Sequence, residues 1–167
     1  MSNIVNEAKL KNFICRGIRG QLEHRALWLY YLVDEAKKLG VDPSLYAGAA
    51  INRCGRYQGA ELHKVKTMKN GLVGFRKTLF TRPTQWMFEM KVVESTPDAL
   101  KLNFHYCPLV KAWQKIGLSD EEIKELCATA MCGDRGLAES QGAELVINKT
   151  IADGDGYCDI QFIAKKD

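Results

Sequence analysis

Cys107 is the residue of this sequence best placed for chemistry, because it stands between a predicted strand end and Pro108, where a helix should begin. A thiol at a helix N-cap faces unpaired backbone N–H groups and the positive end of the helix dipole, which lowers the pKa of cysteine below its usual value of about 8.5. The position therefore predicts a nucleophile, with His105 on the same side of the strand as its base or orienting partner. The alternative is a buried apolar role for Cys107 and a solvated His105.

Asp134 is the second candidate, because it falls in phase with the apolar side of a helix that begins near Ser119. A carboxylate that faces a core must be hydrogen-bonded, protonated or placed in a pocket with a shifted pKa, as acid and base residues are. The alternative is that Gly133 and Gly136 end this helix, which would make Asp134 a loop or cap residue. The apolar side consists of Ile123, Leu126, Cys127, Ala130 and Met131.

Cys158 shares one face of a predicted strand with two apolar residues, which favours a core position. The preceding turn contains Gly154 and Asp155 and brings carboxylates close to the thiol, although a hairpin needs such residues for its geometry alone. The turn lacks the glycine and glutamate that a calcium loop requires, so calcium is not expected. A structural role is predicted for the other cysteines without a supporting pattern: Cys15, Cys54 and Cys132.

The composition of the 167 residues, 46% apolar and 26% charged, is that of a soluble globular protein with one core. No apolar segment approaches the roughly 18–20 residues that span a bilayer, and the N-terminus lacks the pattern of a secretory signal. We therefore expect a cytoplasmic protein. In a reducing cytoplasm its six cysteines stay unpaired, and the absence of a C-x-x-C spacing argues against structural zinc.

The formal net charge of +4 reflects a basic run between Lys64 and Arg82. The run lacks an RNP-type motif, a zinc finger and a persuasive helix-turn-helix, so a solvated helix face is expected rather than a nucleic-acid surface. One arginine of the run, Arg76 or Arg82, is the candidate for holding a substrate carboxylate through paired hydrogen bonds. The sequence does not decide between the two.

The elements that must position these residues form a helical half, about 1–82, and a β-β-α-α-β-β half, about 83–167. Helical spacing predicts a helix over 20–39, a second from Asp42-Pro43 to about 56, and one or two within 61–80. Alternation predicts hairpins over 84–106 and 144–164, with helices after Pro108 and Ser119 between them. The expected fold is a single α+β domain whose antiparallel sheet of two hairpins flanks a helical pair.

Three segments in this order, HYCPLVKAW, ELCATAMCGDRGLAE and TIADGDGYCDIQF, resemble the L-2-amino-thiazoline-4-carboxylic acid hydrolase family. The resemblance covers about residues 85–162, with a weaker similarity at EHRALWLYYLVDEA in the helical half. Carried over position by position, it points to five residues: Cys107, Asp134, Gly154, Asp155 and Cys158.

The resemblance implies a hydrolase that acts on the C–N bonds of a cyclic amidine and opens the ring to a carbamoyl-cysteine. Cys107 would attack the ring carbon between nitrogen and sulfur, Asp134 or Asp155 would transfer protons, and Cys158 would shape the pocket. A metal-assisted version would use Cys107, Cys158 and Asp134 as ligands of a divalent metal, with His105 as an optional further ligand.

A different interpretation is a non-catalytic domain that senses a small molecule or a metal, similar to 4-vinyl reductase-type domains. The hydrolase and the sensory domain would each bind a small molecule, and neither would bind a membrane. The sequence leaves open whether the chain forms a homo-oligomer.

Overall fold

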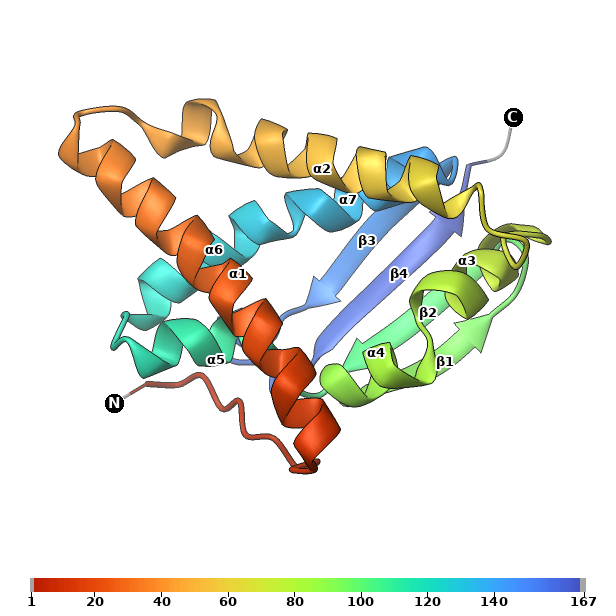
Figure 1. The fold of residues 1–167 in the computed structure, drawn as a ribbon, viewed down its shortest axis with the longest axis horizontal. Helices are drawn as coiled ribbons and strands as arrows, with labels where there is room; N and C mark the ends of the chain where they lie inside the picture. The colour runs from red at the N-terminus through yellow and green to blue at the C-terminus, as the bar shows by residue number, and fades with distance from the viewer. Residues whose placement is uncertain (1, 166–167) are drawn as a thin grey trace.

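The computed structural model describes residues 2–165. A long helix, α1, begins at Phe13 because the side chain of Asn12 accepts a hydrogen bond from the Cys15 N–H (2.8 Å), seven residues before the predicted start. Figure 1 shows α1 and α2 crossing the molecule from the turn that joins them. The helices are α1 (Phe13–Lys38), α2 (Ala47–Leu62), α3 (Gly71–Leu79), α4 (Arg82–Met87), α5 (Pro108–Lys115), α6 (Asp120–Ala130) and α7 (Cys132–Ser140), with 3-10 turns η1 (Pro43–Leu45) and η2 (Ile151–Asp153).

The four strands form one antiparallel sheet in the order β1-β2-β4-β3, so the two hairpins meet along β2 and β4. This confirms the α+β class and the pair of hairpins. The register places Phe104 opposite Cys158. Cys107 follows Phe104 by three residues, so the end of β2 carries it toward the start of β4. The strands are β1 (Met90–Ser95), β2 (Ala99–Phe104), β3 (Ala143–Lys149) and β4 (Cys158–Ala164).

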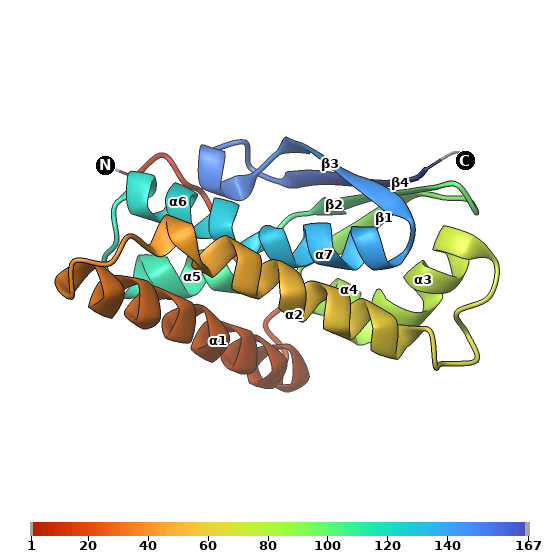
Figure 2. The same ribbon diagram turned by 90° about the horizontal axis from the view of Figure 1, so that it is seen from above.

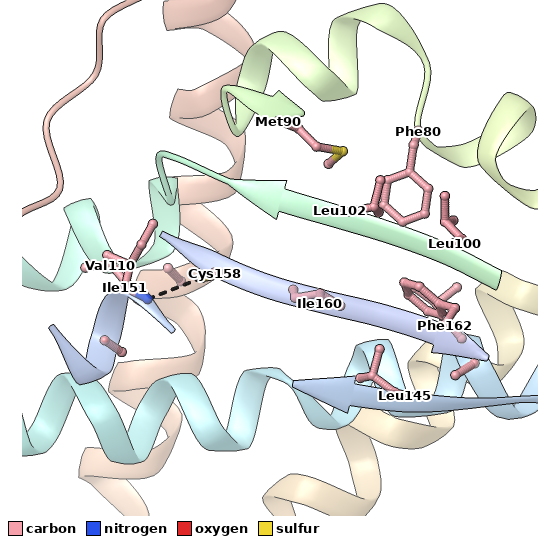
Figure 3. Packing of buried hydrophobic residues seen from close by; sticks show 14 of the residues in the cluster. Phe80, Met90, Leu100, Leu102, Val110, Leu145, Ile151, Cys158, Ile160 and Phe162 are labelled. Atoms are coloured by element: carbon pink, nitrogen blue, oxygen red, sulfur yellow. Dashed lines mark hydrogen bonds between the residues drawn. The ribbon is translucent and has the colours of Figure 1, made fainter. Parts of the chain in front are cut away.

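The helices cover one face of this sheet, as the view from above shows (Figure 2). Alternation along β2 and β4 turns Leu100, Leu102 and Phe162 toward the helices, and each is at most 1% exposed. Figure 3 shows this core, with Phe80 from the loop after α3 packed beside the strands. Polar residues occupy the other face, where Lys101 lies 3.3 Å from the Asp159 carboxylate.

Glycines allow α2 and α7 to pack closely. A Cβ at Gly55 would overlap the carbonyl oxygen of Gly133, and a Cβ at Gly136 would overlap that of Asn52. Gly133 and Gly136 therefore lie inside α7 as contact residues and end no helix. The helix that begins after Ser119 ends at Ala130, so Asp134 lies on a separate helix and, contrary to the prediction from the sequence, does not continue the apolar side of the first one. The chain bends at Met131, which ends α6 and precedes α7.

Several predicted elements differ from the structure. The predicted pair of helices between the hairpins is three helices, α5, α6 and α7. Residues 82–87 form α4 rather than the start of a strand, because Pro83 suits the first turn of a helix. Glu89 then takes a positive φ of 47°, which turns the chain into β1. Within 61–80, only α3 forms a new helix, and residues 63–70 connect it to α2.

Among residues 2–165, no helix combines the length and the apolar character needed to cross a bilayer.

Candidate functional site: a cysteine cluster at the start of α5

Cys107 is the N-cap residue of α5 and Pro108 opens the helix, as the sequence predicted. The residue is half-buried and packs against the apolar core. This burial raises the pKa of the Cys107 thiol, while the backbone N–H groups of Val110 and Leu109 act in the opposite direction. The expected lowering of the pKa was wrong, because loss of water around the thiol outweighs the stabilisation by the helix N-terminus.

Asn6 fixes the backbone of Cys107 from both sides. Its side-chain amide donates to the Cys107 carbonyl oxygen (2.8 Å), and the Cys107 N–H donates to Asn6 Oδ1 (2.9 Å). Asn6 is only 2% exposed. Sequence reasoning missed this residue, because a single asparagine in an N-terminal segment without a motif carries no visible signal.

The N-terminal segment, residues 2–12, is itself anchored beside α1 and β1. The N–H groups of Lys9 and Leu10 donate to the Glu89 carboxylate at 2.6 and 2.7 Å, and Arg19 forms a buried ion pair with the same carboxylate at 3.1 Å. The Arg19 guanidinium also lies 4.3 Å from the centre of the Tyr106 ring. These contacts determine where the segment runs and so bring Asn6 to Cys107.

Asp134 lies in the first turn of α7 and is partly buried. Removal of water from its carboxylate raises its pKa to about 6, and the positive charge of Arg25 on α1 opposes this rise without cancelling it. Arg25 also acts to lower the pKa of the Cys107 thiol, and the charge of Asp134 acts to raise it. Cys107, Asp134 and Arg25 therefore share one electrostatic environment.

Two further thiols complete this cluster. Cys158 is 8% exposed, and its sulfur accepts a hydrogen bond from the Ile151 N–H at 3.3 Å (Figure 3). Burial raises the pKa of Cys158 to about 12, and burial also raises that of Cys127 on α6, with the charge of Cys107 adding to both shifts. We refer to Cys107, Cys127, Cys158 and Asp134 as the cysteine cluster. Cys127 was predicted only as part of an apolar stripe, so its place here was missed.

A hollow of about 280 Å³ opens beside the cluster, between α6, α7 and the end of β3. Cys127 lines it, and so do three cationic side chains, those of Lys124, Arg135 and Lys149. Lys124 is engaged with the Asp153 carboxylate. The hollow therefore combines a thiol with positive charge suited to a small anionic molecule.

Residues 19–162 match the sequence profile of the L-2-amino-thiazoline-4-carboxylic acid hydrolases. The chain belongs to this family. No curated protein matches it as a relative. A similar fold occurs in the crystal structure of a trafficking protein particle complex subunit 3 from Naegleria fowleri covalently bound to palmitic acid, with a TM-score of 0.55 and 17% identity over 86% of this chain and 95% of that one.

Of the residues predicted for this hydrolase-family chain, Cys107, Asp134 and Cys158 lie close enough for the charges of Cys107 and Asp134 to act on the Cys158 thiol. His105 instead lies exposed with its ring 5.7 Å from that of Tyr157, because β2 ends at Phe104 and the chain turns. Asp155 accepts the Thr150 N–H (3.0 Å) within its own exposed turn.

Gly154 also serves the geometry of that turn, with a φ of +89°. Arg76 and Arg82 line a different hollow, whose lining contains none of the cluster residues.

The metal-assisted alternative needed Cys107, Cys158 and Asp134 as one ligand set, with or without His105. Within residues 2–165, no three histidine, cysteine, aspartate or glutamate side chains converge closely enough to hold a metal ion. The described part of the chain does not assemble this ligand set.

Proposed function

We propose that the protein opens a small cyclic amidine such as L-2-amino-thiazoline-4-carboxylate, with Cys107 as nucleophile and Asp134 as general base. The observation that carries this proposal is the shared environment of the two groups, in which the charge of Asp134 acts on the Cys107 thiol and Arg25 acts on both groups. Membership of the hydrolase family supports the reaction class. A carboxyl group with a pKa of about 6 is ionised near neutral pH yet basic enough to accept a proton in the transition state.

In the first step the Cys107 sulfur bonds to the ring carbon between nitrogen and sulfur, and its proton passes to Asp134. The bond from this carbon to the ring sulfur then breaks, and the ring sulfur takes the proton from Asp134. Water adds to the resulting isothiourea, the bond to Cys107 breaks, and a carbamoyl-cysteine leaves with the free thiol of Cys107 restored. This route keeps both nitrogens on the carbon and breaks a C–S bond, which gives N-carbamoyl-cysteine. Cleavage of the ring C–N bond, which the family resemblance implied, balances equally well and would give S-carbamoyl-cysteine.

A substrate of this size fits the hollow of about 280 Å³, whose lining includes Cys127 but neither Cys107 nor Asp134. The proposal therefore requires the substrate ring to extend beyond this lining to reach the Cys107 sulfur. Arg135 and Lys149 line the hollow, and we assign the substrate carboxylate to them rather than to Arg76 or Arg82. The Val110 and Leu109 N–H groups, which act on the Cys107 thiol, would stabilise negative charge as it develops there.

The test is ring opening followed by mass spectrometry, with and without a chelator. Cys107→Ser should lose turnover by several orders of magnitude and Asp134→Asn by about 10²–10⁴-fold. Cys54→Ser, which changes an exposed thiol on α2, is the matched control and should retain full turnover. Unchanged turnover in Cys107→Ser would remove the nucleophile from the proposal, and loss to the chelator would favour metal-assisted attack.

A second candidate is a non-catalytic acyl-carrying domain. The fold is similar to that of a protein covalently bound to palmitic acid, and Cys107 packs against an apolar core. The thiolate would attack the thioester carbonyl of an acyl-coenzyme A, and coenzyme A would leave as its thiol. Incubation with palmitoyl-coenzyme A should then add one acyl group in the intact mass. Hydroxylamine should remove that group, and Cys107→Ser should never acquire it.

A further inference from the structure

The positive charge of the chain is concentrated in one segment. Residues 62–88 contain six cationic side chains and no aspartate or glutamate, whereas the formal net charge of the whole chain is only +4. The rest of the chain is therefore slightly acidic. The cations are Lys64, Lys66, Lys69, Arg76, Lys77 and Arg82.

Three of these cations surround one hollow of about 540 Å³ at the junction of α3 and α4. Arg76 and Lys77 come from the last turn of α3, and Arg82 is the first residue of α4. Phe80, Thr81 and Gln85 supply the rest of the lining. The volume lies within the range of pockets that bind small organic ligands.

The loop between the two helices is held in place, so the cations start from a fixed backbone. Gln85 donates from its side-chain amide to the Phe80 carbonyl oxygen (2.8 Å), and the Thr84 hydroxyl donates to the Leu79 carbonyl oxygen (3.0 Å). The Phe80 ring is 5% exposed and packs edge-on against Phe75 at a centroid distance of 5.4 Å. A fixed backbone reduces the entropy lost when a ligand is bound.

Arg76, Lys77 and Arg82 form no ion pair with any carboxylate of residues 2–165. By contrast, Lys64 in the same segment lies 2.6 Å from Glu61. Three cations around one hollow without a protein anion repel one another and are stabilised when an anion enters. A dianion matches this charge better than a single carboxylate does.

We propose that the hollow between α3 and α4 binds a phosphate monoester, carried either by a soluble organic phosphate or by a lipid headgroup. Arginine suits this role because its planar guanidinium can donate two parallel hydrogen bonds to phosphate oxygens. The site shares no lining residue with the cysteine cluster or its adjacent hollow, so it does not depend on the proposed hydrolase activity.

The experiment uses the full chain and two pairs of substitutions that remove the same charge. Arg76→Gln with Arg82→Gln changes the hollow, whereas Lys66→Gln with Lys69→Gln changes the same basic segment outside the lining. Binding is measured by calorimetry with glycerol 3-phosphate, and by co-sedimentation with phosphatidylcholine vesicles that contain either phosphatidic acid or phosphatidylserine. If the arginine variant fails to fold, as judged by circular dichroism, Lys77→Gln with Arg82→Gln replaces it, since both of these residues are exposed.

Replacing the two arginines should weaken binding at least tenfold, and replacing the two lysines should change the affinity less than twofold. Binding of glycerol 3-phosphate would identify a soluble source, and binding only to phosphatidic acid vesicles would identify a lipid headgroup. Equal loss in both variants, or equal binding to phosphatidylserine vesicles or to a DNA oligonucleotide, would show a diffuse basic surface and overturn the proposal. Absence of binding to both phosphate monoesters would also overturn it.

Discussion

Replacement of Asn6 by alanine tests whether the N-terminal segment holds the start of α5. The substitution removes two hydrogen bonds, of 2.8 and 2.9 Å, to the carbonyl oxygen and N–H of Cys107. Each such bond contributes about 0.5–1.5 kcal/mol, and a buried group left without a partner costs more than the lost bond alone. Because Asn6 is 2% exposed, water cannot easily replace it, and we expect a loss of about 2–4 kcal/mol in the free energy of unfolding.

Urea denaturation followed by circular dichroism measures this loss by linear extrapolation. Asn3→Ala is the matched control, because Asn3 is exposed in the same segment and contacts Asp120 through its backbone N–H. It should change stability by less than about 0.5 kcal/mol. If Asn6→Ala behaves like Asn3→Ala, the two hydrogen bonds do not hold the segment, and our account of how Cys107 is positioned is wrong.

Three further substitutions test other parts of the structure by the same measurement. Arg19→Met should cost about 3–5 kcal/mol, because it leaves the buried Glu89 carboxylate without its ion pair, and adding Glu89→Gln should recover part of the loss. Gly55→Ala should cost roughly 1–3 kcal/mol through overlap with α7, whereas Gly17→Ala, with open space around it, should stabilise α1 by about 0.5–1 kcal/mol. Folding raises the pKa of Asp134 from 3.8 to about 6, so the folded state binds its proton more tightly and this group lowers stability as pH rises from about 4 to 6. Asp134→Asn should therefore be about 1–2 kcal/mol more stable than the native chain at pH 7, allowing for partial exposure, and no more stable at pH 3.5.

Local sequence signals predicted those elements whose ends are set by nearby residues. The Ser119 side chain accepts the Glu122 N–H, and the Glu122 carboxylate accepts the Ser119 N–H, so the capping box defines the start of α6 as expected. The same reasoning failed at residues 84–87, where apolar residues fit both a strand and a short helix. The pairing of β2 with β4 joins residues far apart in the sequence, and no local pattern contains that information.

The candidate site divides in the same way. The place of Cys107 at a helix start depends on its neighbour Pro108 and was predictable. The direction of the pKa shift of Cys107 depends on its burial among segments distant in the sequence, whereas the local sequence shows only the helix that begins at Pro108. Asn6 lies 101 positions away from Cys107, and Arg25 reaches the cluster from α1, so only the assembled fold reveals either one.

The raised pKa values of Cys107 and Asp134 also separate the two proposed functions. An amidine is basic and carries a positive charge at neutral pH, so a bound substrate would favour both the Asp134 carboxylate and the Cys107 thiolate. At an effective dielectric constant of about 20, a unit charge at 4 Å contributes about 4 kcal/mol, which is about 3 pKa units. The amidinium charge of the substrate would thus favour ionisation of the Cys107 nucleophile. A neutral acyl thioester supplies no such charge, so its transfer to Cys107 should be slow at pH 7 and should accelerate steadily as the buried thiol ionises at higher pH.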